Sequence, residues 1–197
     1  MAVKAYVFDV GETLVDERRH WEVLADAAGV SHEAMRSALA DVAERGVHHR
    51  EVFATLGVDA LRVHDEWQPA DLYPDAVHCL ARLREAGYIV GVAANQPRGA
   101  EDFLRRLFPF DLIGTSAAWG VEKPAPEFFE RVAAGVPVER GAVAYVGDRV
   151  DYDVLPALRA GMTAVHIRRG PWGRVRDTPQ DAIAIDSLDQ VPEAIGG

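Results

Sequence analysis

The apolar run at residues 3–8 most constrains the fold, because it is interrupted only by Lys4 and ends directly at Asp9. Such a run predicts a strand that is buried on both faces, as in a parallel sheet. Open parallel sheets bind their ligands beyond the carboxyl ends of the strands. Asp9, followed closely by Gly11, therefore lies where chemistry is expected; the alternative is an aspartate that only caps the turn.

The chain from Leu72 onward alternates between helices and strands. We expect strands at residues 88–93, 111–114, 142–146 and 163–167, and a short edge strand at 182–185. Helices are expected at 74–86, 99–107, around 128–132 and at 153–160, with a last helix from about 188. This alternation predicts an α/β fold built on a doubly wound parallel sheet.

Residues 16–72 interrupt this alternation with a helical insertion. Apolar residues three or four apart predict helices at about 17–28 and 32–45, and shorter helical pieces are expected around 51–56 and 59–67. An insertion directly after the first strand lies over the end of that strand, where a lid excludes water and selects substrate. We therefore divide the chain into an α/β core, residues 1–15 and 73–197, and an all-helical cap, residues 16–72.

The composition excludes several classes of protein. The 197 residues carry a formal net charge of −10, which argues against binding to nucleic acid or to an anionic membrane. The single cysteine, Cys79, excludes an internal disulfide bond, and its place in an apolar helical stripe indicates a core residue. The chain has no basic-then-apolar leader and no apolar run near the roughly 18 residues that cross a membrane. We expect a cytoplasmic protein.

Polar residues stand at the predicted carboxyl ends of three strands: Asp9, Asn95 and Asp148. Asp153 follows in the next helix, and an intervening loop supplies Lys123, one of only two lysines in the chain. Two carboxylates that converge from different strands repel each other unless a cation lies between them. Oxygen ligands suit a hard ion, and Mg²⁺ is the usual ion where phosphate is also bound. These residues predict a Mg²⁺ site beside a lysine that faces a phosphoryl group or neutralises the carboxylates.

In this order, the motifs resemble those of the haloacid dehalogenase superfamily of aspartate-nucleophile hydrolases. Residues 8–14 resemble the nucleophile loop, residues 93–95 the second motif, residues 123–124 the third, and residues 147–153 the acidic fourth motif. The resemblance covers nearly the whole chain, apart from the sequence of the insertion. It implies a Rossmann-like core that carries a small helical cap after the first motif.

The resemblance also implies the chemistry of the site. Asp9 would attack phosphorus to give an aspartyl-phosphate, which water then hydrolyses. Mg²⁺ would be held by Asp9, the backbone carbonyl of Gly11 and Asp148, with Asp153 acting through a water or as a more remote ligand. Lys123 would stabilise Asp9 and the phosphoryl group. The resemblance places three residues at the substrate: Thr13, Asn95 and Lys123.

Two positions depart from the family's pattern. A second aspartate usually stands two residues after the nucleophile, as acid to the leaving group and base to the water, but this chain has Gly11 there. The serine or threonine that usually ends the second motif's strand is Ala94. The first departure removes proton transfer worth about 10²–10⁴-fold in rate. The candidates for a replacement acid, each with a solvated surface residue as its alternative, are Glu12, His20, His48 and His49.

The pattern leaves several functions open. One is a Mg²⁺-dependent phosphatase for a small phosphomonoester, and another is a protein that keeps the site but acts by binding a ligand or partner. A 2-haloacid dehalogenase also lacks the second aspartate, but it works without metal, which the acidic fourth motif disfavours. A phosphonate hydrolase needs a cap lysine, and the insertion has none. Trp172, after a predicted strand, is expected to pack against the tail rather than rim the site.

Overall fold

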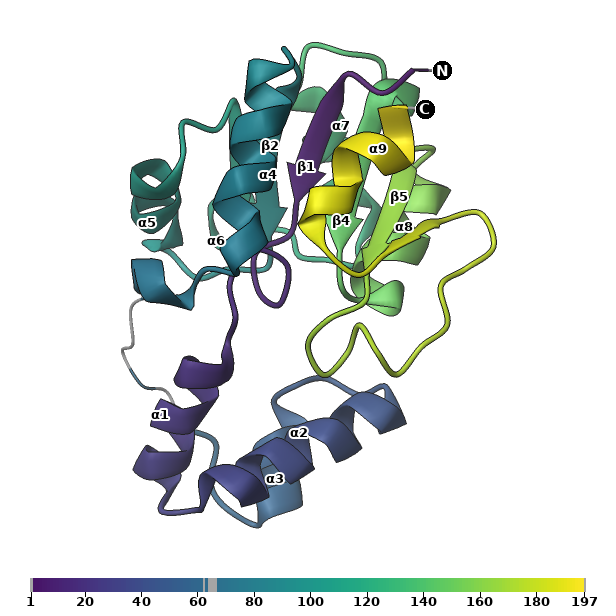
Figure 1. Cartoon of the computed structure of the whole chain (residues 1–197). Helices are drawn as coiled ribbons and strands as arrows, with labels where there is room; N and C mark the ends of the chain where they lie inside the picture. The colour runs from purple at the N-terminus through teal and green to yellow at the C-terminus, as the bar shows by residue number, and fades with distance from the viewer. Residues whose placement is uncertain (1, 62, 64–66, 197) are drawn as a thin grey trace.

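The computed structural model describes residues 2–61, 63 and 67–196, and a six-stranded parallel sheet forms its centre. The strands are β1 (Ala5–Phe8), β2 (Ile89–Ala94), β3 (Leu112–Thr115), β4 (Val143–Gly147), β5 (Thr163–Ile167) and β6 (Ile183–Ile185). Their order is β3-β2-β1-β4-β5-β6 (Figure 1). The winding changes direction between β1 and β4, which is where open α/β sheets bind their ligands.

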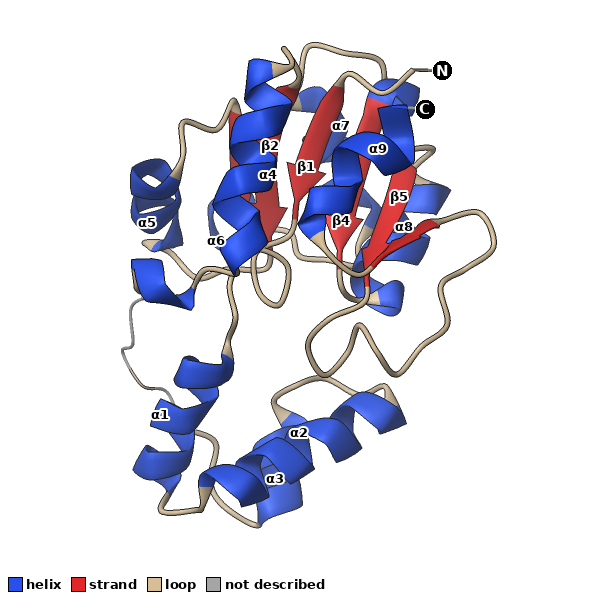
Figure 2. Cartoon of the chain, in the orientation of Figure 1, coloured by secondary structure: helices blue, strands red, loops and turns tan. Residues whose placement is uncertain are grey.

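Helices cover both faces of the sheet, which confirms the doubly wound α/β fold (Figure 2). Three helices pack on one face: α4 (Pro74–Glu85), α5 (Ala100–Leu107) and α9 (Val191–Gly196). Two pack on the other: α7 (Pro126–Ala134) and α8 (Leu155–Arg159). A single turn, α6 (Ser116–Trp119), follows β3, and short 3₁₀ turns span Pro69–Asp71, Arg140–Ala142 and Leu188–Gln190.

The central strand β1 explains why its sequence is so apolar. Tyr6 and Phe8 belong to the hydrophobic cluster on one face of the sheet, and Ala5 and Val7 belong to the cluster on the other. All four side chains are fully buried. Because side chains alternate along a strand, only a run without polar residues can bury both faces. The following residue, Asp9, lies just beyond the carboxyl end of β1.

In the described part of the insertion, three α-helices lie beyond the carboxyl edge of the sheet: α1 (Arg18–Ala28), α2 (His32–Arg45) and α3 (Glu51–Leu56) (Figure 1). These cap helices have their own hydrophobic cluster, which includes Trp21, Met35 and Phe53. The α2 boundaries match the prediction. Ser31 caps the start of α2, where its Oγ accepts a hydrogen bond from the N–H of Ala34 at 3.1 Å.

The predicted helix at 59–67 is wrong for residues 59–61, 63 and 67, which form no helix; residues 62 and 64–66 lie outside the described part of the chain. Gly57, at φ 68°, ends α3, and the N–H of Val58 bonds back to the carbonyl of Phe53 at 3.0 Å. Leu61 and Val63, two residues apart, both pack against the cap cluster.

A segment that follows β5 connects the core to the cap. Trp172 is 7% exposed and belongs to the cap's hydrophobic cluster, so the expectation that it packs against the tail is wrong. An Nη of Arg176 donates to the backbone carbonyl of Glu44 in α2 at 3.3 Å. The segment leaves β5 at the carboxyl edge of the sheet, which is the edge that faces the cap. Sequence order alone does not reveal this proximity.

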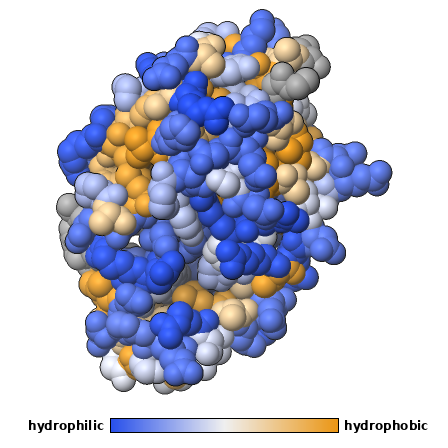
Figure 3. Space-filling model, viewed as in Figure 1, coloured by the Kyte–Doolittle hydropathy of each residue, from blue (hydrophilic) through white to orange (hydrophobic). Residues whose placement is uncertain are grey.

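Polar and charged side chains cover most of the face seen in Figure 3, in keeping with the net charge of −10. Among the described residues, no helix combines the length and the apolar character needed to span a bilayer.

Candidate active site

The carboxyl ends of β1 and β4 bring Asp9 and Asp148 to the same edge of the sheet. Phe8, the last residue of β1, is level with Val146 in β4, and the N–H of Asp9 donates to the carbonyl of Val146 at 2.8 Å. Asp9 is 8% exposed and Asp148 is 3% exposed. The parallel pairing therefore buries two carboxylates close together, as the strand-end argument predicts.

Lys123 reaches this edge from the loop before α7 and forms ion pairs with two of the carboxylates. Its Nζ lies 2.5 Å from Oδ1 of Asp9 and 2.6 Å from Oδ1 of Asp153. Burial disfavours the charged ammonium, but the attraction of Asp153 and Asp9 outweighs it and holds the pKa of Lys123 well above its ordinary value. Lys123 is therefore a fixed positive charge beside the predicted nucleophile.

Asp153 approaches Lys123 through a π-helical turn, Val150–Val154, which replaces the start of the helix expected at 153–160. Its Oδ2 accepts a hydrogen bond from the N–H of Arg149 at 2.9 Å. A Cβ on Gly147 would clash with the carboxyl carbon of Asp153. Glycine at position 147 thus gives Asp153 the room to turn back against the end of β4.

The acidic cluster carries more negative charge than its lysine balances. One oxygen from each of Asp9, Asp148 and Asp153 lies within 4.8 Å of the others. Asp148 makes no ion pair with any residue that the structure describes, although it is almost completely buried. To stay ionised, a buried carboxylate of this kind needs a cation beside it. Three hard oxygen ligands around an unbalanced charge fit Mg²⁺.

The pKa shifts of the cluster have the same cause. Burial raises the pKa of Asp9 to about 6, with Lys123 opposing the shift and Asp153 adding to it. Burial, followed by the charges of Asp153 and Asp9, holds the pKa of Asp148 well above its ordinary value. Both pKa shifts arise because it is unfavourable to hold several ionised carboxylates close together in a buried site. A bound dication would relieve that cost, which is a second reason why the residues fit a metal ion.

Asn95, just beyond β2, makes two hydrogen bonds to the backbone of Lys123 through the oxygen and the nitrogen of its side-chain amide. Its Oδ1 accepts from the N–H of Lys123 at 2.7 Å, and its Nδ2 donates to the carbonyl of Lys123 at 3.0 Å. Asn95 therefore holds the loop that presents Lys123. Ala94, where the family usually has a hydroxyl, is fully buried at the end of β2. A contact between Asn95 and substrate stays a prediction.

The turn after Asp9 places Glu12 and Thr13 in buried positions. Glu12 adopts φ 52°, and its Oε2 accepts a hydrogen bond from the hydroxyl of Tyr73 at 2.6 Å. Burial raises the pKa of Glu12, against a lowering effect of Tyr73. Thr13 is fully buried, and its Oγ1 has no hydrogen-bond partner among the described residues. An Nη of Arg169 donates to the carbonyl of Thr13 and so fixes the turn from the far end of the chain.

Gly11 lies against a carboxylate that the sequence did not single out. A Cβ on Gly11 would lie 2.5 Å from Oε1 of Glu17, which precedes helix α1. Burial, followed by the charges of Glu12 and Asp9, raises the pKa of Glu17 to about 8. Sequence reasoning misses Glu17 because its place beside the site depends on how the chain enters the cap. The signal that could have found it is the empty side-chain position at Gly11.

His166 is another residue that the sequence did not single out. Its ring is fully buried in β5, with Nε2 3.1 Å from the carbonyl oxygen of Asp148 and Nδ1 2.7 Å from Oγ1 of Thr178. Burial lowers the pKa of His166, so the neutral ring is favoured. A neutral imidazole that donates to the Asp148 carbonyl fixes the loop on which the Asp148 carboxylate stands.

The cap histidines cluster around aromatic rings at the face of the cap. The rings of His48 and His49 are 4.1 Å apart, and His49 is 6.1 Å from Trp21. His48 lies 6.5 Å from Tyr152 of the core, whose ring stacks under the Arg149 guanidinium at 4.1 Å. Burial, and then the charge of His48, lowers the pKa of His49 to about 3. His49 is therefore neutral near pH 7.

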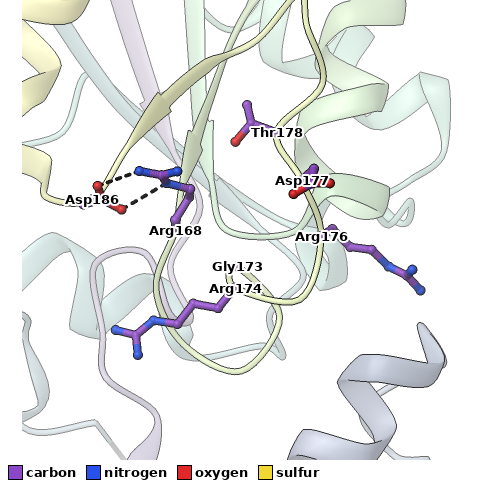
Figure 4. A pocket seen from close by; sticks show the side chains of 7 residues that line it. All are labelled: Arg168, Gly173, Arg174, Arg176, Asp177, Thr178 and Asp186. Carbon is purple, nitrogen blue, oxygen red and sulfur yellow. Dashed lines mark hydrogen bonds and ion pairs between the residues drawn. The ribbon is translucent and has the colours of Figure 1, made fainter.

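A pocket of about 430 Å³ lies next to the site on the segment after β5 (Figure 4). It is lined by Arg168, Gly173, Arg174, Arg176, Asp177, Thr178 and Asp186. Arg168 is turned toward Asp186, at 2.6 Å. Thr178 connects the pocket to the site through His166. None of the acidic cluster lines it, so it is distinct from the candidate active site.

The chain is similar in sequence to proteins named as phosphatases. The glyceraldehyde 3-phosphate phosphatase of Methanopyrus kandleri is 31% identical over 181 residues, which are 90% of this chain and 70% of that protein. The glyceraldehyde 3-phosphate phosphatase of Methanocaldococcus jannaschii is 31% identical over 127 residues, or 62% of this chain. That second match spans only 56% of the relative's length.

Solved structures share the architecture. The HAD-hydrolase YfnB of Bacillus subtilis, bound to magnesium, aligns over 100% of both chains with a TM-score of 0.75 and 16% identity, which shows a common fold. The family model of haloacid dehalogenase-like hydrolases matches residues 3–161, a range that contains the whole acidic cluster and Lys123. The chain belongs to the haloacid dehalogenase-like hydrolases.

Proposed function

We propose that this protein is a Mg²⁺-dependent phosphatase that acts on a small phosphomonoester, through an aspartyl-phosphate formed on Asp9. The observation that carries the proposal is the buried contact between Asp9 and Lys123, within a cluster whose carboxylates outnumber its lysine. Packing alone does not account for four charged groups in one dry space. The curated relatives named as phosphatases support the choice of phosphorus as the reacting atom.

In the proposed reaction, a carboxylate oxygen of Asp9 attacks phosphorus. The bond from phosphorus to the leaving oxygen breaks, and that oxygen takes up a proton. Water then attacks the phosphorus of the aspartyl-phosphate, loses a proton, and releases inorganic phosphate and free Asp9. Lys123 offsets the negative charge of the phosphoryl group during both steps, from the position it already holds at 2.5 Å from Asp9.

Asp9, Asp148 and Asp153, with the carbonyl of Gly11, are the residues that would hold Mg²⁺, which supplies positive charge to the phosphoryl oxygens when bound. His166 holds the loop that carries Asp148 through its hydrogen bond to the Asp148 carbonyl. The N–H of Arg149 holds the Asp153 carboxylate in place through a second hydrogen bond. The substrate is a small molecule, and we expect the reaction to take place in the cytoplasm, since the single cysteine, Cys79, is free and buried.

The test is hydrolysis of p-nitrophenyl phosphate and acetyl phosphate, with Mg²⁺ and with EDTA, by the wild type and Asp9→Asn. We expect metal-dependent turnover that falls by more than about 10⁴-fold in Asp9→Asn, the scale on which loss of a nucleophile acts. Asp102→Asn is the matched control, because Asp102 is an exposed aspartate on α5.

Two other outcomes would contradict the proposal. If Mg²⁺ binds but no turnover depends on Asp9, the chain acts by binding a ligand or partner. If Asp9-dependent halide release from 2-chloropropionate proceeds in EDTA while neither phosphate compound reacts, the chain is a 2-haloacid dehalogenase.

A further inference from the structure

The space beside Gly11 is filled by the carboxylate of Glu17. A Cβ on Gly11 would lie 2.5 Å from Oε1 of Glu17 and 2.8 Å from its carboxyl carbon. Real Cβ atoms do not approach other heavy atoms this closely, so a side chain at position 11 and the Glu17 carboxylate would compete for one space. Glu17 therefore puts a carboxyl group at the position from which residue 11 would project.

Glu17 can reach this position because its side chain does not cap the helix that it precedes. Its carbonyl accepts the N–H of Trp21 at 3.0 Å, but its carboxylate makes no capping hydrogen bond to α1. The neighbouring acid, Asp16, by contrast forms an ion pair with Arg18 at 2.8 Å. Glu17 stands at the first junction between core and cap, so its side chain points back toward the turn after β1.

Three of the other candidate acids, Glu12, His48 and His49, make contacts elsewhere. The carboxylate of Glu12 accepts the Tyr73 hydroxyl at 2.6 Å, and it packs where a Cβ on Gly170 would lie. His48 and His49 stack on each other and on aromatic rings of the cap and core. Within the described part of the chain, Glu17 is the carboxylate whose oxygen occupies the space next to Gly11.

We propose that Glu17 is the acid and base of the reaction, in place of the side chain absent at position 11. The inference rests on the proposed phosphatase function. When the bond between phosphorus and the leaving oxygen breaks, Glu17 gives its proton to that oxygen; when water attacks the aspartyl-phosphate, the Glu17 carboxylate takes the proton that water loses. The two transfers return Glu17 to its starting state, so each turnover is balanced.

The test compares kcat/KM for p-nitrophenyl phosphate with kcat/KM for phenyl phosphate, whose leaving oxygen is far more basic and needs a proton to depart. In Glu17→Gln, we expect kcat/KM for phenyl phosphate to fall by about 10²–10⁴-fold and kcat/KM for p-nitrophenyl phosphate to fall much less. Glu33→Gln, an exposed glutamate in α2, is the matched control and should change neither value.

A second variant keeps the test decisive if Glu17→Gln disturbs the fold. In Gly11→Asp/Glu17→Ala, the truncated Glu17 side chain leaves room for the introduced aspartate to act as the acid directly. We expect at least about tenfold more phenyl phosphate turnover than in Glu17→Ala alone, a fraction of what a positioned acid contributes. Gly11→Asp alone should unfold at a lower temperature than the wild type, because its Cβ meets Glu17.

Different failures can be told apart. If Asp9-dependent turnover is present but Glu17→Gln lowers both substrates equally, or neither, Glu17 is not the acid while the phosphatase function stands. A loss confined to phenyl phosphate in Glu12→Gln, with Glu17→Gln as active as the wild type, would assign the role to Glu12 instead. If no turnover depends on Asp9, both proposals fail together.

Discussion

The two halves of the site draw their side chains from different parts of the chain. In the lysine half (Lys123, Asn95, Asp148 and Asp153), the polar and charged groups come from strand ends and their adjoining loops. In the turn half (Gly11, Glu12, Glu17 and Tyr73), the family's usual residue is missing, and side chains from the cap junction and from before α4 fill the space.

In the proposed reaction, this difference separates two parts of the chemistry. Nucleophilic attack and charge neutralisation need groups in fixed relation to Asp9, and a rigid sheet edge supplies them. Proton transfer needs only a carboxyl group near the leaving oxygen, which several backbone positions can deliver. The turn half can therefore be rebuilt from other residues while the lysine half stays unchanged.

In the lysine half, Lys123→Met is the change with the largest expected effect on stability. The change leaves the buried carboxylates of Asp9 and Asp153 without their cation, and we expect a loss of roughly 3–5 kcal/mol in the free energy of unfolding, measured by urea titration in EDTA. Mg²⁺ should restore part of this stability. The control, Arg105→Met, removes an ion pair to Asp102 in which both side chains are more than 60% exposed, and it should have no measurable effect. Equal losses in the two variants would contradict the pairing described for Lys123.

Tyr73→Phe is the corresponding change in the turn half. It removes the donor at 2.6 Å from the Glu12 carboxylate, and leaving that buried group unpaired should cost roughly 1–3 kcal/mol of unfolding free energy. Thermal unfolding at neutral pH measures it. Tyr152→Phe is a suitable comparison, since Tyr152 contributes its ring rather than a hydrogen-bonded hydroxyl to the Arg149 contact. A Tyr73→Phe variant as stable as Tyr152→Phe would show that Glu12 does not depend on Tyr73.

The smallest effect is expected at the cap, from His49→Gln. Burial, and then the charge of His48, lowers the pKa of His49 from 6.5 to about 3. Below pH 6.5 the unfolded chain binds a proton at this residue that the folded protein does not, so folded stability falls as the pH drops toward 3. Between about pH 6.5 and 5.5 the difference is at most about 1.4 kcal/mol. His49→Gln should flatten this part of the stability curve, followed by the fluorescence of the adjoining Trp21; parallel curves for variant and wild type would refute the assignment.

Elements with strong local signals can be predicted from the sequence. The cap at Ser31 and the apolar spacing after it predict helix α2 at its observed bounds, and Gly46 ends it. Asp9 and Asp148 can be predicted to lie together because parallel strands end at one edge of the sheet. The predicted helix at 59–67 rests on an apolar pattern too short to distinguish a helix from other structure, and its described residues form no helix.

The remaining residues of the site act across long separations that leave no local pattern. Arg169 holds the turn at Thr13 from 156 residues away, and His166 binds the Asp148 loop from a neighbouring strand. Glu17 is near Asp9 in sequence, but its contact with Gly11 depends on the direction in which the chain enters α1. Such contacts follow from tertiary packing, which a single sequence does not display.

The indole of Trp172 has a consequence for how often the active site opens. Trp172 belongs to the core by sequence and to the cap by packing. A cap that moves away on its own must expose this ring, and burial of a large apolar side chain is worth about 1.5–3 kcal/mol. At about 1.4 kcal/mol for each factor of ten, this one side chain would make separation of the cap from the core roughly ten- to a hundredfold less favourable than it would be with a small residue at position 172.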